Sequence, residues 1–149
     1  MTMKLTCREY MQIIDTAPDA ILFSDREGNI HLWNEGAEHV FGFSHAEAMG
    51  QSLNIIIPPR LRERHWEGYY RAIATGEIRY GKYELLSVPA LRKDGSQISC
   101  AFSMIIMRDE DNEIIGMASI LRDVTKAWDK EKELRQQIAE LKRDKSQQD

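Results

Sequence analysis

The sequence predicts one α+β domain in which helices cover an antiparallel sheet, and three observations lead to this expectation. First, five apolar or β-branched runs are of strand length, and they are 20–24, 30–33, 80–88, 98–107 and 114–121. Second, turn sequences at 25–29, 92–95 and 109–112 join neighbouring runs, which favours hairpins. Third, apolar residues in 98–107 alternate with small or polar ones, so one face of the sheet should be buried against the helices.

Capping residues mark the first turns of three helices. They are Thr6 with Glu9, Asn34, and Ser44 with Glu47. Pro18 ends the first of these helices and Gly42 the second, because proline does not continue a helix and glycine accommodates the left-handed residue that closes one. We therefore expect one helix before the sheet and two short helices after its first two strands.

A further helix is expected from Pro58 and Pro59, which open it, to Gly76, which closes it. Its apolar face is formed by residues three and four apart, which are Leu61, His65, Gly68, Tyr69, Ala72 and Ile73. His65 should therefore point towards the core. Gly68 costs about 1 kcal/mol of helix propensity relative to alanine, and it removes a side chain beside the imidazole, which leaves a gap for a flat molecule.

The chain becomes strongly charged from residue 126 onwards, and a helix with a narrow apolar seam is expected there. The seam residues, in a four-then-three spacing, are Ala127, Glu131, Leu134, Ile138 and Leu141. About two heptads are fewer than a coiled coil normally shows, so the segment is either a solvated terminal helix or a dimerising or signalling linker. The expected division is an N-terminal helix or cap at 1–18, a central domain at 19–125 and a C-terminal linker helix at 126–149.

Composition excludes several classes of function. The 149 residues carry a formal net charge of -4, and without a basic cluster the chain is not expected to bind nucleic acid. Cys7 and Cys100 lie far apart and form no Cys-x-x-Cys pair, so neither a disulfide framework nor a zinc site is expected. No apolar run approaches the roughly 18 residues that span a bilayer, and no catalytic motif is present. We therefore expect a cytoplasmic domain that is not an enzyme.

Several short motifs, taken in their order along the chain, resemble those of PAS sensor domains. They are Gly28-Asn29-Ile30 before Trp33-Asn34-Glu35-Gly36-Ala37, Phe41-Gly42-Phe43 before Gly50, Arg92-Lys93-Asp94-Gly95-Ser96, and the closing Arg122-Asp123-Val124-Thr125. The resemblance covers about residues 6 to 125. It implies the PAS fold, which is a five-stranded antiparallel sheet with helices on one face around a pocket, commonly joined to an effector by a C-terminal coiled coil. The implied role is signal sensing in a bacterial signalling protein, such as one of a two-component system.

Within this family, residues 59–77 resemble the heme-binding branch, which includes the FixL-type oxygen-sensing kinases and the direct oxygen sensor phosphodiesterase. His65 falls at the position of their proximal histidine, so the resemblance implies heme b with His65 as the iron ligand. Arg71 and Arg79 fall where FixL-type domains place basic residues that contact the heme propionates. Heme requires this chemistry, since iron needs a neutral imidazole and buried carboxylates need cations.

The other side chains expected at the cofactor differ from those of the oxygen sensors. They are Tyr69, Tyr80, Tyr83, Leu85, Phe102 and Met104. Leu85 stands where those sensors carry a distal arginine, and Tyr83 stands where the phosphodiesterase carries a distal methionine. Such a pocket stabilises oxygen poorly unless a tyrosine hydroxyl turns inward, whereas CO and NO depend less on a donor. Met104 could instead provide a sixth ligand through its thioether, which would make the redox state a second signal.

Two alternatives to heme remain open from the sequence. One is a cofactor-free module that dimerises through its sheet and flanking helices. The other is a PAS domain that binds flavin or another small ligand without a covalent bond, because Leu53 occupies the position of the reactive cysteine of photoactive flavin-binding relatives. In the heme hypothesis, the signal passes along 114–121 through Asp123 into the C-terminal helix. Three further histidines should be exposed and uninvolved in metal binding, and they are His31, His39 and His45.

Overall fold

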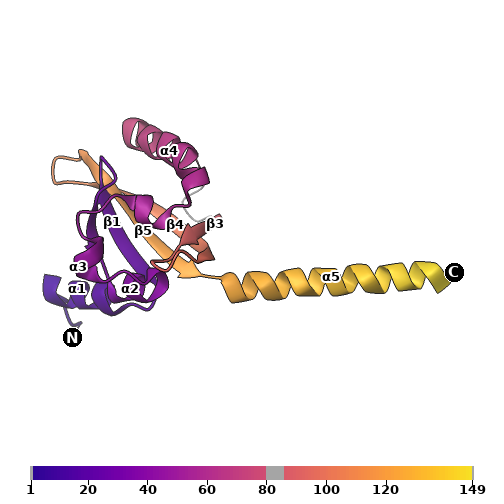
Figure 1. Cartoon of the computed structure of the whole chain (residues 1–149). Helices are drawn as coiled ribbons and strands as arrows, with labels where there is room; N and C mark the ends of the chain where they lie inside the picture. Colours follow the sequence, from indigo (N-terminus) through magenta and orange to yellow (C-terminus); the bar gives the residue numbers. More distant parts are fainter. Residues whose placement is uncertain (1, 80–85, 149) are drawn as a thin grey trace.

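The computed structural model describes residues 2–79 and 86–148, which form one sheet, five α-helices and two 3₁₀ turns. The strands are β1 (Ala20–Asp25), β2 (Ile30–Trp33), β3 (Leu86–Leu91), β4 (Gln97–Arg108) and β5 (Ile114–Asp123). The helices are α1 (Cys7–Thr16), α2 (Glu35–Phe41), α3 (His45–Ala48), α4 (Arg62–Thr75) and α5 (Thr125–Gln148), and the 3₁₀ turns are η1 (Leu53–Ile56) and η2 (Pro59–Leu61). Helices α2, α3 and α4 lie on one side of the sheet, and α5 extends away from the domain (Figure 1).

The sheet is antiparallel throughout, with the strand order β2-β1-β5-β4-β3, which confirms the predicted fold class. Its central strand is β5, the last strand of the chain, and one neighbour of β5 is β1, near the start of the chain. Ser24 lies opposite Met117 in this pair. Ala20, Leu22 and Ser24 alternate along β1 and are all buried, because successive strand residues point to opposite faces. β1, whose alternate side chains are buried, is therefore paired with the strand that leads into α5.

The local signals of the sequence produce the expected structures at several places. The capping box of Thr6 with Glu9 is present, as is that of Ser44 with Glu47. Gly28 has a φ of 85° in the turn between β1 and β2, a conformation that favours glycine over any residue with a Cβ. Short-range hydrogen bonds and turn chemistry therefore determine these elements.

Asn34 is buried, and its side chain joins α1, β1 and α2 through five hydrogen bonds, one of them a longer bond from Nδ2 to the carbonyl of Ala17 (3.4 Å). Its Oδ1 accepts from the N–H of Ala37, which caps α2 (2.9 Å), and from the N–H of Ile21 on β1 (2.8 Å). Its Nδ2 donates to the carbonyls of Ile14 (2.8 Å) and Asp19 (3.0 Å). The expected helix cap thus also ties the N-terminal helix to the sheet.

Two element boundaries differ from those expected. The helix predicted from Pro58 starts as η2 and becomes α-helical only at Arg62, whereas Gly76 closes it in the left-handed conformation as expected. The third strand was expected at 80–88 and is β3, which continues through Pro89, while residues 80–85 lie outside those described. β3 is an edge strand, so the missing N–H of Pro89 costs no sheet hydrogen bond.

The two terminal helices, α1 and α5, have no buried residue. Tyr10 and Ile13, from the apolar stripe predicted on α1, are 56% and 58% exposed. The seam residues Leu134, Ile138 and Leu141 are likewise exposed on α5. Neither of these helices, nor any other in the described ranges, combines the length and the apolar character needed to cross a membrane.

The start of α5 is hydrogen-bonded to two strands. The N–H of Val124 donates to the carbonyl of Ser99 on β4 (2.8 Å), and the N–H of Ser99 donates to Oγ1 of Thr125 (3.0 Å). The carboxylate of Asp123, the last residue of β5, accepts from the N–H of Thr125 (2.9 Å). The first turn of α5 is therefore anchored to the sheet, and the rest of the helix projects from it.

Candidate functional site

His65 lies on the face of α4 that is turned towards the domain interior. The buried residues of α4 are Tyr69, Ala72 and Ile73, and His65 precedes Tyr69 by one turn, so their side chains lie on the same side of the helix. His65 itself is partly buried. Its ring centroid is 4.7 Å from that of Trp66 and 5.8 Å from that of Tyr69. The imidazole is thus part of an aromatic cluster on α4.

The imidazole of His65 is held in its neutral form by burial. Its Nδ1 is buried and has no hydrogen-bond partner within the described part of the chain. Burial lowers the pKa of His65 from its ordinary 6.5 to about 4, because a charged imidazolium loses its hydration in an apolar environment. At neutral pH His65 therefore carries a free ring lone pair, as a metal or heme ligand must.

Gly68 does not lie against the core, contrary to the expectation from the sequence. It is exposed, and a Cβ built on it would meet no atom of the described residues within 4 Å. With about 100° between successive helix residues, the buried face is centred on Tyr69, between His65 and Trp66, and Gly68 falls at its edge. The absent side chain therefore opens space beside α4 and leaves no internal gap.

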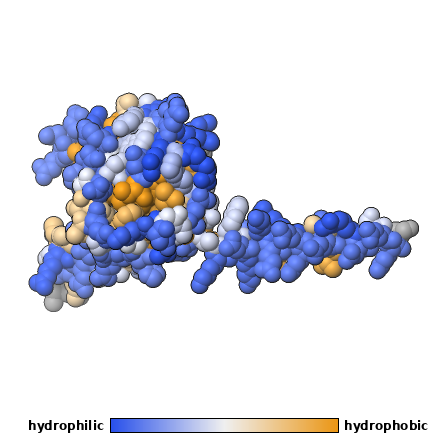
Figure 2. Space-filling view, in the orientation of Figure 1, coloured by the Kyte–Doolittle hydropathy of each residue, from blue (hydrophilic) through white to orange (hydrophobic). Residues whose placement is uncertain are grey.

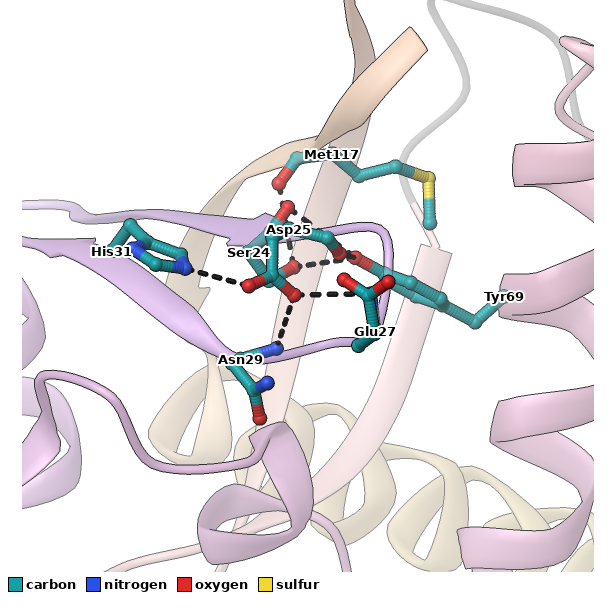
Figure 3. Close-up of polar contacts among 7 residues, drawn as sticks. All are labelled: Ser24, Asp25, Glu27, Asn29, His31, Tyr69 and Met117. Atoms are coloured by element: carbon teal, nitrogen blue, oxygen red, sulfur yellow. Dashed lines mark hydrogen bonds and ion pairs between the residues drawn. The ribbon is translucent and has the colours of Figure 1, made fainter.

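Tyr69 is buried and its hydroxyl is bonded to β1 (Figure 3). The phenol donates to the carbonyl of Asp25 (2.5 Å), which can only accept. Ser24 Oγ lies 2.8 Å from the phenolic oxygen and 3.5 Å from the carbonyl of Met117 on β5. Burial raises the pKa of the Tyr69 phenol, so it remains a donor at neutral pH. The sequence placed Tyr69 at the cofactor, and the structure adds this contact with the sheet.

The carboxylate of Asp25 holds the turn that follows β1. Its Oδ1 accepts from the N–H groups of Glu27 (3.0 Å) and Asn29 (2.9 Å), and its Oδ2 lies 2.6 Å from Nε2 of His31. Burial alone would raise the pKa of Asp25, but the hydrogen bonds from Asn29, His31 and Glu27 hold it below its ordinary value. Asp25 is thus ionised at neutral pH. As expected, His31, His39 and His45 are exposed.

Trp66 and Arg62 fasten α4 to η1, which sequence reasoning did not anticipate. Nε1 of Trp66 donates to Oδ1 of Asn54 (2.8 Å), and Arg62 donates to the carbonyls of Asn54 and Ile57 (3.1 Å each). A Cβ on Gly28 would lie 2.2 Å from the indole ring, so Trp66 packs directly on the turn between β1 and β2. The spacing of Arg62, Trp66 and Tyr69, four then three, was the available signal, because it places them on one face.

On the sheet, the inward-facing residues of β4 become less buried along the strand. Ile98 and Cys100 are buried, whereas Phe102, Met104 and Ile106, in the same alternating phase, are partly exposed although they pack against the core. In Figure 2, apolar residues gather at the surface between α4 and α2 and are surrounded by hydrophilic ones. The sheet therefore presents accessible apolar side chains on its helix-covered face.

The remaining residues expected at the site are either exposed or outside the described ranges. Arg71 on α4 and Arg79 after it are both exposed. Tyr80, Tyr83 and Leu85, the expected distal side of the pocket, lie outside the described residues.

The donor set of this site suits an axial ligand of heme. The imidazole of His65 is neutral, as such a ligand must be, and its buried Nδ1 has no partner in the part of the chain that the structure describes. No group of three or more histidine, cysteine or acidic residues that could hold a metal occurs in ranges 2–79 and 86–148. Leu53 is buried and, being leucine, offers no thiol for a covalent flavin adduct.

Five antiparallel strands with helices on one side are the architecture of the sensor domains of signalling proteins. The profile of the PAS fold matches residues 8–124, so the chain belongs to the PAS family. PAS domains are sensory and typically non-catalytic, and in signalling proteins they commonly dimerise and are linked to effector domains.

Sequence relatives include larger proteins that contain a similar segment. An uncharacterized protein of Azorhizobium caulinodans is 38% identical over 85 residues, which are 56% of this chain and 11% of the relative. Sensor protein FixL of Bradyrhizobium diazoefficiens is 45% identical over 53 residues, which are 36% of this chain and 10% of the relative. The chain therefore spans about a tenth of the length of these relatives.

Similar solved structures show the same fold. The PAS domain of a protein from Colwellia psychrerythraea superposes with a TM-score of 0.69 at 26% identity, covering 80% of this chain and 97% of that one. An RNA-binding light-oxygen-voltage receptor superposes with a TM-score of 0.68 at 19% identity, covering 96% of this chain and 42% of that one. The latter likeness concerns the fold alone.

Proposed function

We propose that this PAS domain binds heme b through His65 and senses a diatomic gas (O2, CO or NO) or the redox state. The observation that carries the proposal is the state of His65, a partly buried imidazole that burial keeps neutral and whose Nδ1 has no partner among residues 2–79 and 86–148. An unpaired buried polar group costs free energy, and coordination of iron by the ring would use the free lone pair. The similarity to FixL over 53 residues supports the same assignment.

The other residues would hold the heme and limit what it binds. Arg71 and Arg79, both exposed, would pair with the two propionates at the surface. Phe102 and Met104 would cover the ring with apolar side chains from β4. When bound, heme supplies the iron at which a diatomic gas or an electron is received. Met104, as a thioether on the sheet side, is the candidate for a sixth ligand.

We further propose that the domain works as a homodimer joined through its terminal helices and passes its signal to an effector through α5. Leu134, Ile138 and Leu141 are exposed along one seam of α5, and the four-then-three spacing of that seam fits a second helix with the same repeat. α5 begins directly after β5, with its first turn bonded to β4. A change in the sheet would therefore reach the helix at its base.

A second candidate function is a cofactor-free dimerisation module. The observation in its favour is the packing of Trp66 and Tyr69 around the His65 ring, with centroids 4.7 and 5.8 Å away. In that case the aromatic cluster is simply part of the core. A third candidate, a flavin or other small organic ligand, would be recognised by mass spectrometry of what is released when the purified protein is denatured.

The absorption spectrum of the 149-residue chain expressed with added hemin tests the heme proposal. We expect a Soret band in the wild type that shifts with CO after reduction. His65→Ala should lose the band, while His39→Ala, a substitution of an exposed histidine on α2, should keep it. Circular dichroism checks that His65→Ala is folded. A colourless wild type that is dimeric by light scattering, or an unchanged band in His65→Ala, would contradict heme ligation by this residue.

A further inference from the structure

Three side chains of α4 reach other parts of the domain, and they reach two different places. Arg62 and Trp66 both bond to η1 through Asn54. Tyr69 instead bonds to β1, through the carbonyl of Asp25 and the hydroxyl of Ser24. Of the polar side-chain contacts of α4 described above, that of Tyr69 is the one that leads into the sheet.

Tyr69 is buried, so breaking its hydrogen bonds is unfavourable. Tyr69 is 4% exposed and Ser24 is 1% exposed, so water cannot readily replace a lost partner. A buried donor left without an acceptor is unfavourable by more than the hydrogen bond itself contributes. A displacement of α4 must therefore either carry β1 with it or break these bonds.

The residues that Tyr69 contacts are connected to the strand that leads into α5. Ser24 is paired with Met117 of β5, and its hydroxyl lies 3.5 Å from the Met117 carbonyl. Asp25, whose carbonyl accepts from the phenol, also fixes the following turn through its carboxylate (Figure 3). Because these hydrogen bonds hold the turn in one conformation, a displacement of Asp25 would move the whole end of β1.

We propose that Tyr69 is a positioning residue that sets α4, and with it His65, against β1, and that its hydroxyl transmits displacement of α4 to β1 and β5. The second part rests on the proposed function, since binding at His65 would provide the displacement. Tyr69 thereby transmits the signal from α4 to the sheet through its hydroxyl, in addition to any contact of its ring with a cofactor.

The first test uses the heme-free chain and measures amide hydrogen exchange in α4. Tyr69→Phe keeps the ring and removes the hydroxyl, and we expect exchange in residues 62–75 to become about fivefold faster. Tyr70→Phe is the matched control, because Tyr70 is exposed, and should leave the rates unchanged. Ser24→Ala should also accelerate exchange, and the double variant should add less than the sum of the two effects. Unchanged rates in Tyr69→Phe, or additive effects, would overturn the positioning role.

The second test uses the heme-loaded, reduced chain and compares exchange with and without CO. In the wild type and in Tyr70→Phe, CO should change exchange in α4 and in segments 20–25 and 114–123. In Tyr69→Phe, CO should still shift the Soret band and change α4, while the two strand segments respond at least fivefold less. An equal response of the strands in Tyr69→Phe, or none in the wild type, would overturn the transmission. If the wild type takes up no heme, the proposed function and the transmission that rests on it both fail, and the heme-free cycle decides the positioning role of Tyr69.

Discussion

The burial of His65 predicts a specific dependence of domain stability on pH. The folded pKa is about 4, below the ordinary 6.5 expected for the unfolded chain. Between these values the unfolded state binds more protons, so the free energy of unfolding falls as the pH is lowered from 6.5 to 4 and changes no further below that. Each pH unit corresponds to about 1.4 kcal/mol. Protonation of His65 should therefore cost the heme-free domain on the order of 3 kcal/mol.

The contribution of His65 is isolated by subtraction, because many carboxylates titrate in the same range. We would measure urea unfolding by circular dichroism from pH 4 to pH 8 for the heme-free wild type and for His65→Gln, which cannot be protonated there. The advantage of the wild type over the variant should shrink by about 3 kcal/mol towards pH 4, with a slope no steeper than about 1.4 kcal/mol per pH unit.

His39→Gln provides the control for this measurement. Its side chain is exposed on α2, so this variant removes an imidazole that is not buried. A constant difference between the wild type and His65→Gln from pH 4 to pH 8 would refute the reasoning, since it would mean that the imidazole of His65 is hydrated in the folded domain. The neutral state of the proposed heme ligand would then lose its physical basis.

Three further substitutions test other parts of the structure. Gly68→Ala should stabilise the heme-free domain by up to about 1 kcal/mol in urea unfolding, because the new Cβ meets only open space; a loss of stability would show that the space is filled. Asn34→Ala should destabilise it by about 2–4 kcal/mol, because the N–H groups of Ile21 and Ala37 lose their buried acceptor, and a change below 1 kcal/mol would argue against this account. Ile138→Asp should convert a dimer to a monomer by light scattering while circular dichroism of the domain is kept, and a dimer that persists would place the interface elsewhere.

The sequence predicted those elements that depend on neighbouring residues. The cap at Asn34 and the capping box at Ser44 form because a side-chain oxygen accepts from an N–H three residues later. Both partners are close in the sequence, so the pattern can be recognised without the structure. The alternation of β4 likewise follows from the two-residue period of a strand. The PAS resemblance then supplied the arrangement of five antiparallel strands with helices on one face, which no local pattern contains.

The contacts that fasten α4 could not be predicted in the same way, because their partners are distant in sequence. Tyr69 and Ser24 are 45 positions apart, and Trp66 and Asn54 are 12 apart. Ser24 reads as an ordinary polar residue at a strand end, although its alternation with Leu22 places it inside. For Gly68 the prediction was wrong, because the sequence placed it on the buried face and the structure shows it exposed. The period of a helix defines a face only to within about one residue at its edges.

Helix α5 projects from the domain (Figure 1), so a small rotation at its base becomes a larger displacement at its far end. Its 24 residues extend about 36 Å, and hydrogen bonds of Val124 and Thr125 with Ser99 of β4 and Asp123 of β5 clamp its base to the sheet. A tilt of about 5° at that clamp would sweep the far tip through about 3 Å over this length. A rotation of the sheet too small to alter the core packing would thus become a displacement of about 3 Å at the far end of α5. A displacement of that size could be detected by a domain attached there.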